Sequence, residues 1–255
     1  MHLVRRPSYV VRLDFFAKGV KMEGFKSRFI EMNGNQLKIV ALLAMTCDHV
    51  GKQLLPRFEI LQILGRLAFP IFAYMIAEGC LHTKSKKKYL MSMVGLALVC
   101  QIAYFFAMGS LYQCVLVTFS LSISLIYLID SARKKRTMAG YLMLFLGIMA
   151  VAIICIILPW VLIGTDFVID YGMIGVLLPV GIYLGKSRKE KLVIMAVFLI
   201  LLGMKMGGIQ WYGLLAASFL VMYNGKRGKM KMKHLFYIYY PLHLLGIYLI
   251  GLVVF

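Results

Sequence analysis

The sequence predicts an all-α, polytopic integral membrane protein with about nine transmembrane helices and a cytoplasmic N-terminus. Of its 255 residues, 62% are hydrophobic and only 15% are charged, whereas a soluble domain has about 45–50% apolar and about 25% charged residues. The apolar residues form runs of the length that a membrane-spanning helix needs. The net charge of +19 is concentrated at every second loop, as the positive-inside rule requires of cytoplasmic loops.

The chain divides into a basic N-terminal extension, residues 1–31, and a membrane domain, residues 32–255. The extension carries seven basic residues and scattered aromatic residues. It has no continuous apolar core, so it does not read as a cleavable signal peptide. Three interpretations remain: a basic interfacial helix, a disordered tail, or a natural translation start at Met32, where the organised sequence begins.

Nine apolar segments follow in order. They span residues 36–55, 60–82, 89–108, 111–130, 138–162, 171–185, 191–205, 209–223 and 234–255. The sixth, seventh and eighth are shorter than the ~20 residues of a straight span, so we expect them to be tilted or to be half-spans. Five basic clusters flank these segments: the N-terminal region through Lys38, then 84–88, 133–136, 186–191 and 226–233. Nine crossings place all five in the cytoplasm, and the loss of any one helix breaks that alternation.

Several ionisable residues lie at membrane depth, where charge is costly and usually functional. Asp48 and His49 lie near the middle of the first segment, Arg66 lies at a similar level on the second, and His243 lies near mid-depth on the last. His49 is a candidate base that Asp48 would orient, and Arg66 is placed to form an ion pair with Asp48. The alternatives are that the ion pair only joins two helices and that His243 is a packing residue.

Charged residues nearer the membrane surfaces suggest binding roles. Glu78 lies toward the cytoplasmic end of the second segment, where it binds a ligand or pairs with a nearby lysine. Asp170 lies at the outer end of the sixth segment, where it bounds an outward-facing vestibule or serves as an ordinary helix-start carboxylate. Lys226 and Arg227, between two glycines, form a basic turn that suits phosphate groups or simply anchors the adjoining helices.

Together these residues resemble the TraX family, from about Met32 to the C-terminus and in the same order. The resemblance is carried by Lys38, Asp48-His49, Gly65-Arg66-Leu67-Ala68-Phe69-Pro70-Ile71-Phe72, Glu78-Gly79, Thr83, Asp170-Tyr171-Gly172 with Gly175, Tyr223-Asn224-Gly225-Lys226-Arg227-Gly228, Phe236-Tyr237, and Tyr240-Pro241-Leu242-His243-Leu244. The Gly-Arg-Leu-Ala-Phe-Pro and Tyr-Pro-Leu-His-Leu blocks are the specific ones. The family includes the enzyme that acetylates the N-terminus of F pilin and is similar to a wider set of membrane acyltransferases.

The resemblance implies a bacterial inner-membrane acetyltransferase that uses cytoplasmic acetyl-CoA as co-substrate and modifies a peptide or glycan acceptor. The implied roles fall into three groups: catalysis by Asp48, His49, Arg66 and His243; donor binding by Asn224, Lys226 and Arg227, with help from the 84–88 cluster; and acceptor binding by Glu78, Asp170 and Tyr240. The residues themselves support a buried acid/base site, whereas acetyl transfer comes from the resemblance alone.

Two other functions fit the same residues. A proton-coupled transporter would use Asp48, His49 and Arg66 as a relay, and a non-catalytic assembly partner would need them only for packing. We expect no metal site, because the five cysteines all lie in apolar surroundings without a Cys-x-x-Cys pair. We also expect no nucleic-acid partner, because the loop clusters adjoin apolar segments. The lipid bilayer is the expected partner, and the sequence specifies neither the acceptor nor an oligomeric state.

Overall fold

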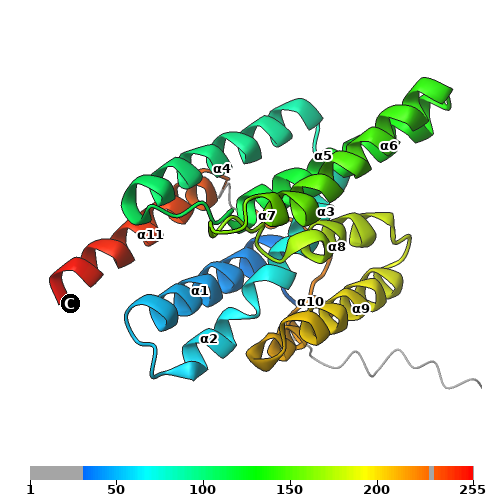
Figure 1. The fold of residues 1–255 in the computed structure, drawn as a ribbon. Helices are drawn as coiled ribbons and strands as arrows, with labels where there is room; N and C mark the ends of the chain where they lie inside the picture. The colour runs from blue at the N-terminus through cyan, green and yellow to red at the C-terminus, as the bar shows by residue number, and fades with distance from the viewer. Residues whose placement is uncertain (1–30, 230–232, 255) are drawn as a thin grey trace, which may run out of the picture. The chain divides into compact units, whose positions relative to one another are not determined.

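The structure, a computed structural model, describes residues 31–229 and 233–254, and its regular elements within these ranges are all helices (Figure 1). The predicted all-α class is therefore confirmed. The α-helices are α1 (Gly34–Gln53), α2 (Glu59–Gly65), α3 (Ala68–His82), α4 (Lys86–Met108), α5 (Val115–Lys135), α6 (Met138–Ala152), α7 (Leu158–Val161), α8 (Gly172–Leu184), α9 (Arg188–Met206), α10 (Ala216–Val221) and α11 (Lys233–Val254). A π-helix, η1 (Ile153–Ile157), joins α6 to α7, and a 3₁₀ helix, η2 (Gly208–Leu215), precedes α10. Except for Glu31, the predicted N-terminal extension lies outside the described residues.

Four helical stretches are long and apolar enough to cross a membrane: Glu59–His82, Lys86–Met108, Val115–Lys135 and Met138–Val161. The chain is therefore a multi-pass membrane protein. Helix α8 is short, as predicted, with 13 residues. Helix α9 is longer than predicted, with 19 residues, because Ser187 caps it upstream of the apolar run. Nine crossings and a cytoplasmic N-terminus remain predictions.

The second predicted segment is broken at Arg66 into α2 and α3. Pro70 has no backbone N–H, so it cannot donate the helical hydrogen bond to the Arg66 carbonyl. On the other side of the break, the Arg66 amide donates to the carbonyls of Gln62, at 3.2 Å, and Ile63, at 3.1 Å. This shared hydrogen bond tightens the last turn of α2. The break places the arginine between two helix ends.

The described basic loops gather at one end of the helices, here called the basic end. The backbone of residues 222–227 hydrogen-bonds to residues 32–35, and Lys191 Nζ lies 2.7 Å from Glu78 Oε1. The hydroxyl of Tyr183 donates to Asp130 at 2.7 Å, beside an ion pair between Lys86 and the same carboxylate. These contacts join the starts of α1, α4 and α9 to the ends of α3, α5, α8 and α10. The predicted alternation of basic loops is thus present in the fold.

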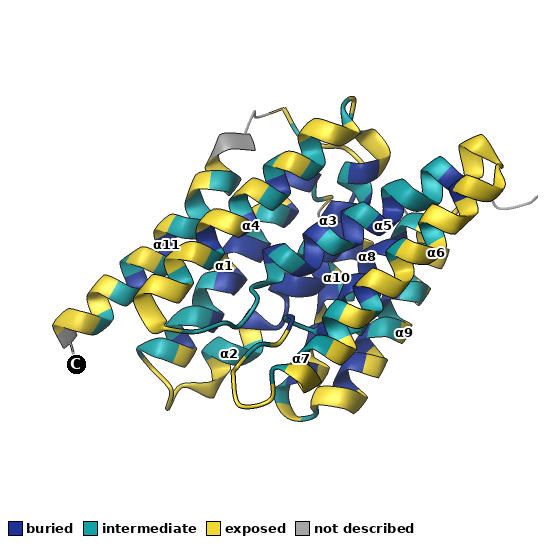
Figure 2. Cartoon of the chain, turned by 45° about the horizontal axis from the view of Figure 1, so that its top comes forward, coloured by how far each residue is buried: buried dark blue, intermediate teal, exposed yellow. Residues whose placement is uncertain are grey.

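Burial divides the helices into a core and a periphery (Figure 2). In the most apolar window of α2–α3, 67% of the residues are buried inside the protein, whereas 6% are buried in that of α6–α7. An apolar helix that buries so little of itself against protein is suited to face lipid. Helices α1 and α2 can approach closely because Gly51 and Gly65 have no side chain at their contact. A Cβ on either glycine would overlap the facing helix.

Candidate functional site

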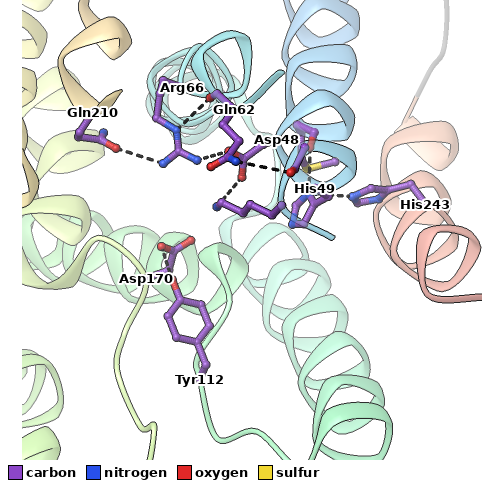
Figure 3. A network of polar contacts seen from close by, with 11 residues as sticks. Asp48, His49, Gln62, Arg66, Tyr112, Asp170, Gln210 and His243 are labelled. Atoms are coloured by element: carbon purple, nitrogen blue, oxygen red, sulfur yellow. Dashed lines mark hydrogen bonds and ion pairs between the residues drawn. The ribbon is translucent and has the colours of Figure 1, made fainter. Parts of the chain in front are cut away.

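A buried ion-pair cluster forms where α1 meets the α2–α3 junction (Figure 3). Arg66 donates through a terminal guanidinium nitrogen to Asp48 Oδ1, and Lys52 Nζ lies 2.6 Å from Asp48 Oδ2. Asp48 and Arg66 are both buried, while the Lys52 side chain is about half exposed. The ion pair expected from helical depth is therefore present, with Lys52 as an additional partner.

Two glutamines complete the surroundings of Arg66. Arg66 Nη1 donates to Gln210 Oε1 at 3.2 Å, and Arg66 Nε donates to the Gln62 carbonyl at 3.3 Å. Gln210 Nε2 is buried and has no hydrogen-bond partner among the described residues, so a donor is left available beside the arginine. Sequence analysis missed Gln210; the available signal was a lone amide near the start of the apolar segment 209–223.

The two histidines predicted at mid-depth meet between α1 and α11 (Figure 3). His243 Nε2 lies 3.4 Å from His49 Nδ1, and the ring centroids are 5.1 Å apart. His49 Nδ1 lies 2.9 Å from the Met45 carbonyl, and His243 Nδ1 lies 3.0 Å from the Tyr239 carbonyl. Carbonyls accept hydrogen bonds, so we assign the proton to Nδ1 of both rings. His49 Nε2 then carries a free lone pair, which is the requirement for a base.

The structure corrects the expectation that Asp48 orients the ring of His49. Successive helical residues point about 100° apart, so Asp48 faces Arg66 while His49 faces α11. The ring of His49 is instead positioned by Met45 and His243. Asp48 acts on it only through its charge.

Tyr240 and Tyr239 surround His243 on α11. The Tyr240 ring stands at 80° to the His243 ring with centroids 5.4 Å apart, and the Tyr239 ring stacks on it at 10°. The Tyr239 hydroxyl lies 2.7 Å from Thr46 Oγ1 and so joins α11 to α1. Tyr240, predicted to bind the acceptor, thus lies against the histidine pair.

Asp170 lies beside the cluster, in the loop that precedes α8. Its carboxylate accepts a hydrogen bond from the Tyr112 hydroxyl at 2.6 Å and interacts electrostatically with Lys52 and Arg66. Burial raises the pKa of the Asp170 carboxyl, while the Tyr112 hydroxyl and the two cations oppose that shift. Tyr171, which follows it, has a left-handed backbone with φ of 60° and stacks on Phe69 at 3.7 Å. Such strain is often found at functional sites.

The remaining predicted site residues lie at the basic end. Glu78 is 12 residues beyond Arg66, or ~18 Å along a helix, and it pairs with Lys191. The carbonyls of Lys226 and Arg227 accept hydrogen bonds from the first amides of α1, and Asn224 Oδ1 accepts from the Lys226 amide at 3.0 Å. The side chains of Lys226 and Arg227 are exposed. The backbone of this turn therefore caps α1, which leaves its side chains for any ligand.

Comparisons with known proteins agree with the sequence motifs. The chain is 33% identical over 82 residues to a protein named probable fimbrial assembly protein FimC, serogroup H1, of Dichelobacter nodosus, covering 31% of this chain and 34% of that protein. It is 47% identical over 38 residues to the uncharacterized protein RP591 of Rickettsia prowazekii, covering 15% of each. These alignments span well under two thirds of either relative, and no solved structure is significantly similar. Residues 33–251 match the family described as TraX protein, so the chain belongs to the TraX family.

Proposed function

We propose that this protein is a membrane-embedded acetyltransferase that moves an acetyl group from cytoplasmic acetyl-CoA to an amine or hydroxyl of an envelope substrate. The observation that carries the proposal is the pair of His49 and His243 beside the Asp48–Arg66 cluster. It supplies a neutral base and fixed positive charge at one buried location, as acyl transfer requires.

The proposed reaction begins at His49 Nε2. This nitrogen takes a proton as the acceptor amine or hydroxyl attacks the thioester carbonyl and forms a tetrahedral oxyanion. Arg66 and the free amide of Gln210 are suited to stabilise that oxyanion by charge and hydrogen bonding. Collapse of the intermediate breaks the C–S bond and releases the CoA thiolate, which recovers the proton from the His49 imidazolium. The His49 Nδ1 proton is shared between the Met45 carbonyl, at 2.9 Å, and His243 Nε2, at 3.4 Å, and these two acceptors would hold the imidazolium in place.

The route of each substrate follows from the two ends of the fold. In the predicted topology the basic end faces the cytoplasm, where acetyl-CoA is found, and the exposed Lys226 and Arg227 would attract its phosphates. The acetyl group would then have to reach ~18 Å along α3 toward Arg66, which the long pantetheine arm permits. The acceptor would approach from the opposite end, past Asp170 and Tyr112.

The acceptor class is proposed from the family and from one relative. TraX proteins resemble the F pilin acetylase, and a protein similar over part of this chain is named a probable fimbrial assembly protein. We therefore propose the amino terminus of a pilin-like peptide as the first acceptor to test, with envelope glycans as the second.

The test is an acetylation assay with purified protein, labelled acetyl-CoA, and pilin-like peptides with free or blocked amino termini. We expect label in the free peptide only, a loss of ~10²–10⁴-fold in His49→Ala, and unchanged transfer in His82→Ala. His82 is the matched control, because it is an exposed histidine at the basic end. CoA release that no acceptor increases, or proton-coupled uptake by liposomes instead of acetylation, would reject the proposal.

A further inference from the structure

A polar pocket of about 230 Å³ opens among the C-terminal half of α3, the start of α9 and the loop after α10. It is lined by Tyr74, Glu78, Lys186, Arg188, Lys191, Tyr223, Asn224 and Gly225. The catalytic assignments above do not use Lys186, Arg188 or Lys191. Their convergence with Glu78 and Asn224 is visible only in the folded chain, because they come from three separate segments.

The pocket carries an excess of positive charge. Lys191 and Glu78 form an ion pair in which the side chains are only 13% and 14% exposed, so these two charges neutralise each other. Lys186 and Arg188 supply further positive charge to the lining, and Glu190, outside the lining, offsets part of the Lys186 charge. One terminal nitrogen of Arg188 donates to the carbonyls of Leu220 and Val221, which fixes the guanidinium at the end of α10 while the side chain stays exposed.

Neutral donors accompany these cations. Tyr74 and Tyr223 are buried and stand edge to face, with ring centroids 6.0 Å apart. Tyrosine hydroxyls keep their protons at neutral pH, so both rings offer neutral hydrogen-bond donors.

We propose that this pocket binds phosphate groups of coenzyme A; this rests on the proposed acetyltransferase function and assigns its donor subsite. Lys186 and the anchored guanidinium of Arg188, together with protonated hydroxyls, match a polyanion. The volume lies below the roughly 300 Å³ of the smallest sites for drug-sized ligands, so the pocket holds the phosphates and leaves the pantetheine arm free. Tyr74 lies eight residues beyond Arg66 on the same helical stretch, so that arm would run along α3 toward the histidines.

Anionic lipid headgroups offer the same phosphate chemistry at the membrane surface, and they are the competing occupant. Position favours the coenzyme, because the lining includes Asn224 and Gly225, which lead directly into the exposed Lys226 and Arg227. A soluble polyanion could contact both groups of cations at once.

The experiment measures coenzyme A binding by isothermal titration calorimetry on the full chain in phosphatidylcholine nanodiscs, with and without phosphatidylglycerol. We compare Lys186→Gln with Lys189→Gln, which removes the same charge from the same basic cluster, 186–191, at an exposed position in the first turn of α9 outside the pocket lining. Lys186→Gln should raise Kd about tenfold, equivalent to ~1.4 kcal/mol, and reduce its dependence on salt; Lys189→Gln should stay within about twofold. Arg188→Lys, which keeps the charge but loses the hydrogen bonds that anchor the guanidinium to Leu220 and Val221, should also raise Kd.

The outcomes distinguish a failure of the pocket assignment from a failure of the proposed acetyltransferase function. Coenzyme A that binds with the same affinity to both glutamine variants would overturn the pocket assignment and leave the proposed function standing. Stabilisation by phosphatidylglycerol that Lys186→Gln abolishes, with coenzyme A affinity unchanged, would assign the pocket to lipid instead. Absence of any coenzyme A binding by the wild-type protein would overturn the acetyltransferase proposal itself, and with it the pocket assignment.

Discussion

Replacing Asp48 by Asn should destabilise the fold by ~3–5 kcal/mol, the usual cost of removing one partner from a buried ion pair. The side chains of Arg66 and Asp48 are 8% and 12% exposed, so water cannot solvate the guanidinium once the carboxylate is gone. Gln210 and the Gln62 carbonyl still accept hydrogen bonds from Arg66, but neither supplies negative charge.

Lys52→Gln is the matched control, because Lys52 binds the other oxygen of the same carboxylate. Its side chain is 49% exposed, and ion pairs with that much solvent contribute at most ~1 kcal/mol. The double variant Asp48→Asn/Arg66→Leu removes both buried charges. Its loss of unfolding free energy should be well below the sum of the two single losses, because a buried pair replaced as a unit is often nearly neutral.

The assay is equilibrium unfolding in mixed detergent micelles at fixed lipid composition, with circular dichroism of the helices as the signal. Strict additivity of the Asp48 and Arg66 substitutions would refute the coupling. A loss of unfolding free energy in Lys52→Gln as large as that in Asp48→Asn would also refute the reasoning, because burial would then not determine the strength of these ion pairs.

Three further outcomes follow from the same geometry. Gln210→Leu should lower kcat by ~10²–10³-fold, the usual effect of losing an oxyanion donor, with little change in the KM for acetyl-CoA; steady-state kinetics that show only a KM change would contradict this. Gly65→Ala should lower the unfolding midpoint, at a cost of ~1–3 kcal/mol, because its Cβ would overlap the Asp48 side chain; an unchanged midpoint would show that α1 and α2 separate freely. Cysteines placed at Lys134 and Asp166 should be labelled from opposite sides of the membrane, and labelling of both from one side would refute the predicted topology.

The end of the helices opposite the basic end depends on one loop that sequence patterns do not describe. Residues 111–114 were predicted to begin a helix, but α5 starts at Val115. The Gln113 amide donates instead to the Val168 carbonyl at 2.9 Å, and Asp166 accepts from the Leu111 amide at 2.8 Å. These pairings between segments more than 50 residues apart position Tyr112 against Asp170. Hydrophobicity alone cannot reveal them, because an apolar run reads the same whether its first residues are helical or extended.

The sequence by itself determined the membrane class, the alternation of basic loops and the pairing of Asp48 with Arg66. Each depends on a local property: apolar run length, loop charge, or helical rise of ~1.5 Å per residue, which sets depth. Only the tertiary structure decided that His49 faces His243 and not Asp48, that Gln210 joins Arg66, and that α9 contributes cations to a pocket beside α3. Depth is fixed by counting along one helix. The direction in which a side chain points is fixed by how each helix is rotated against its neighbours, and that rotation is set by packing between distant segments.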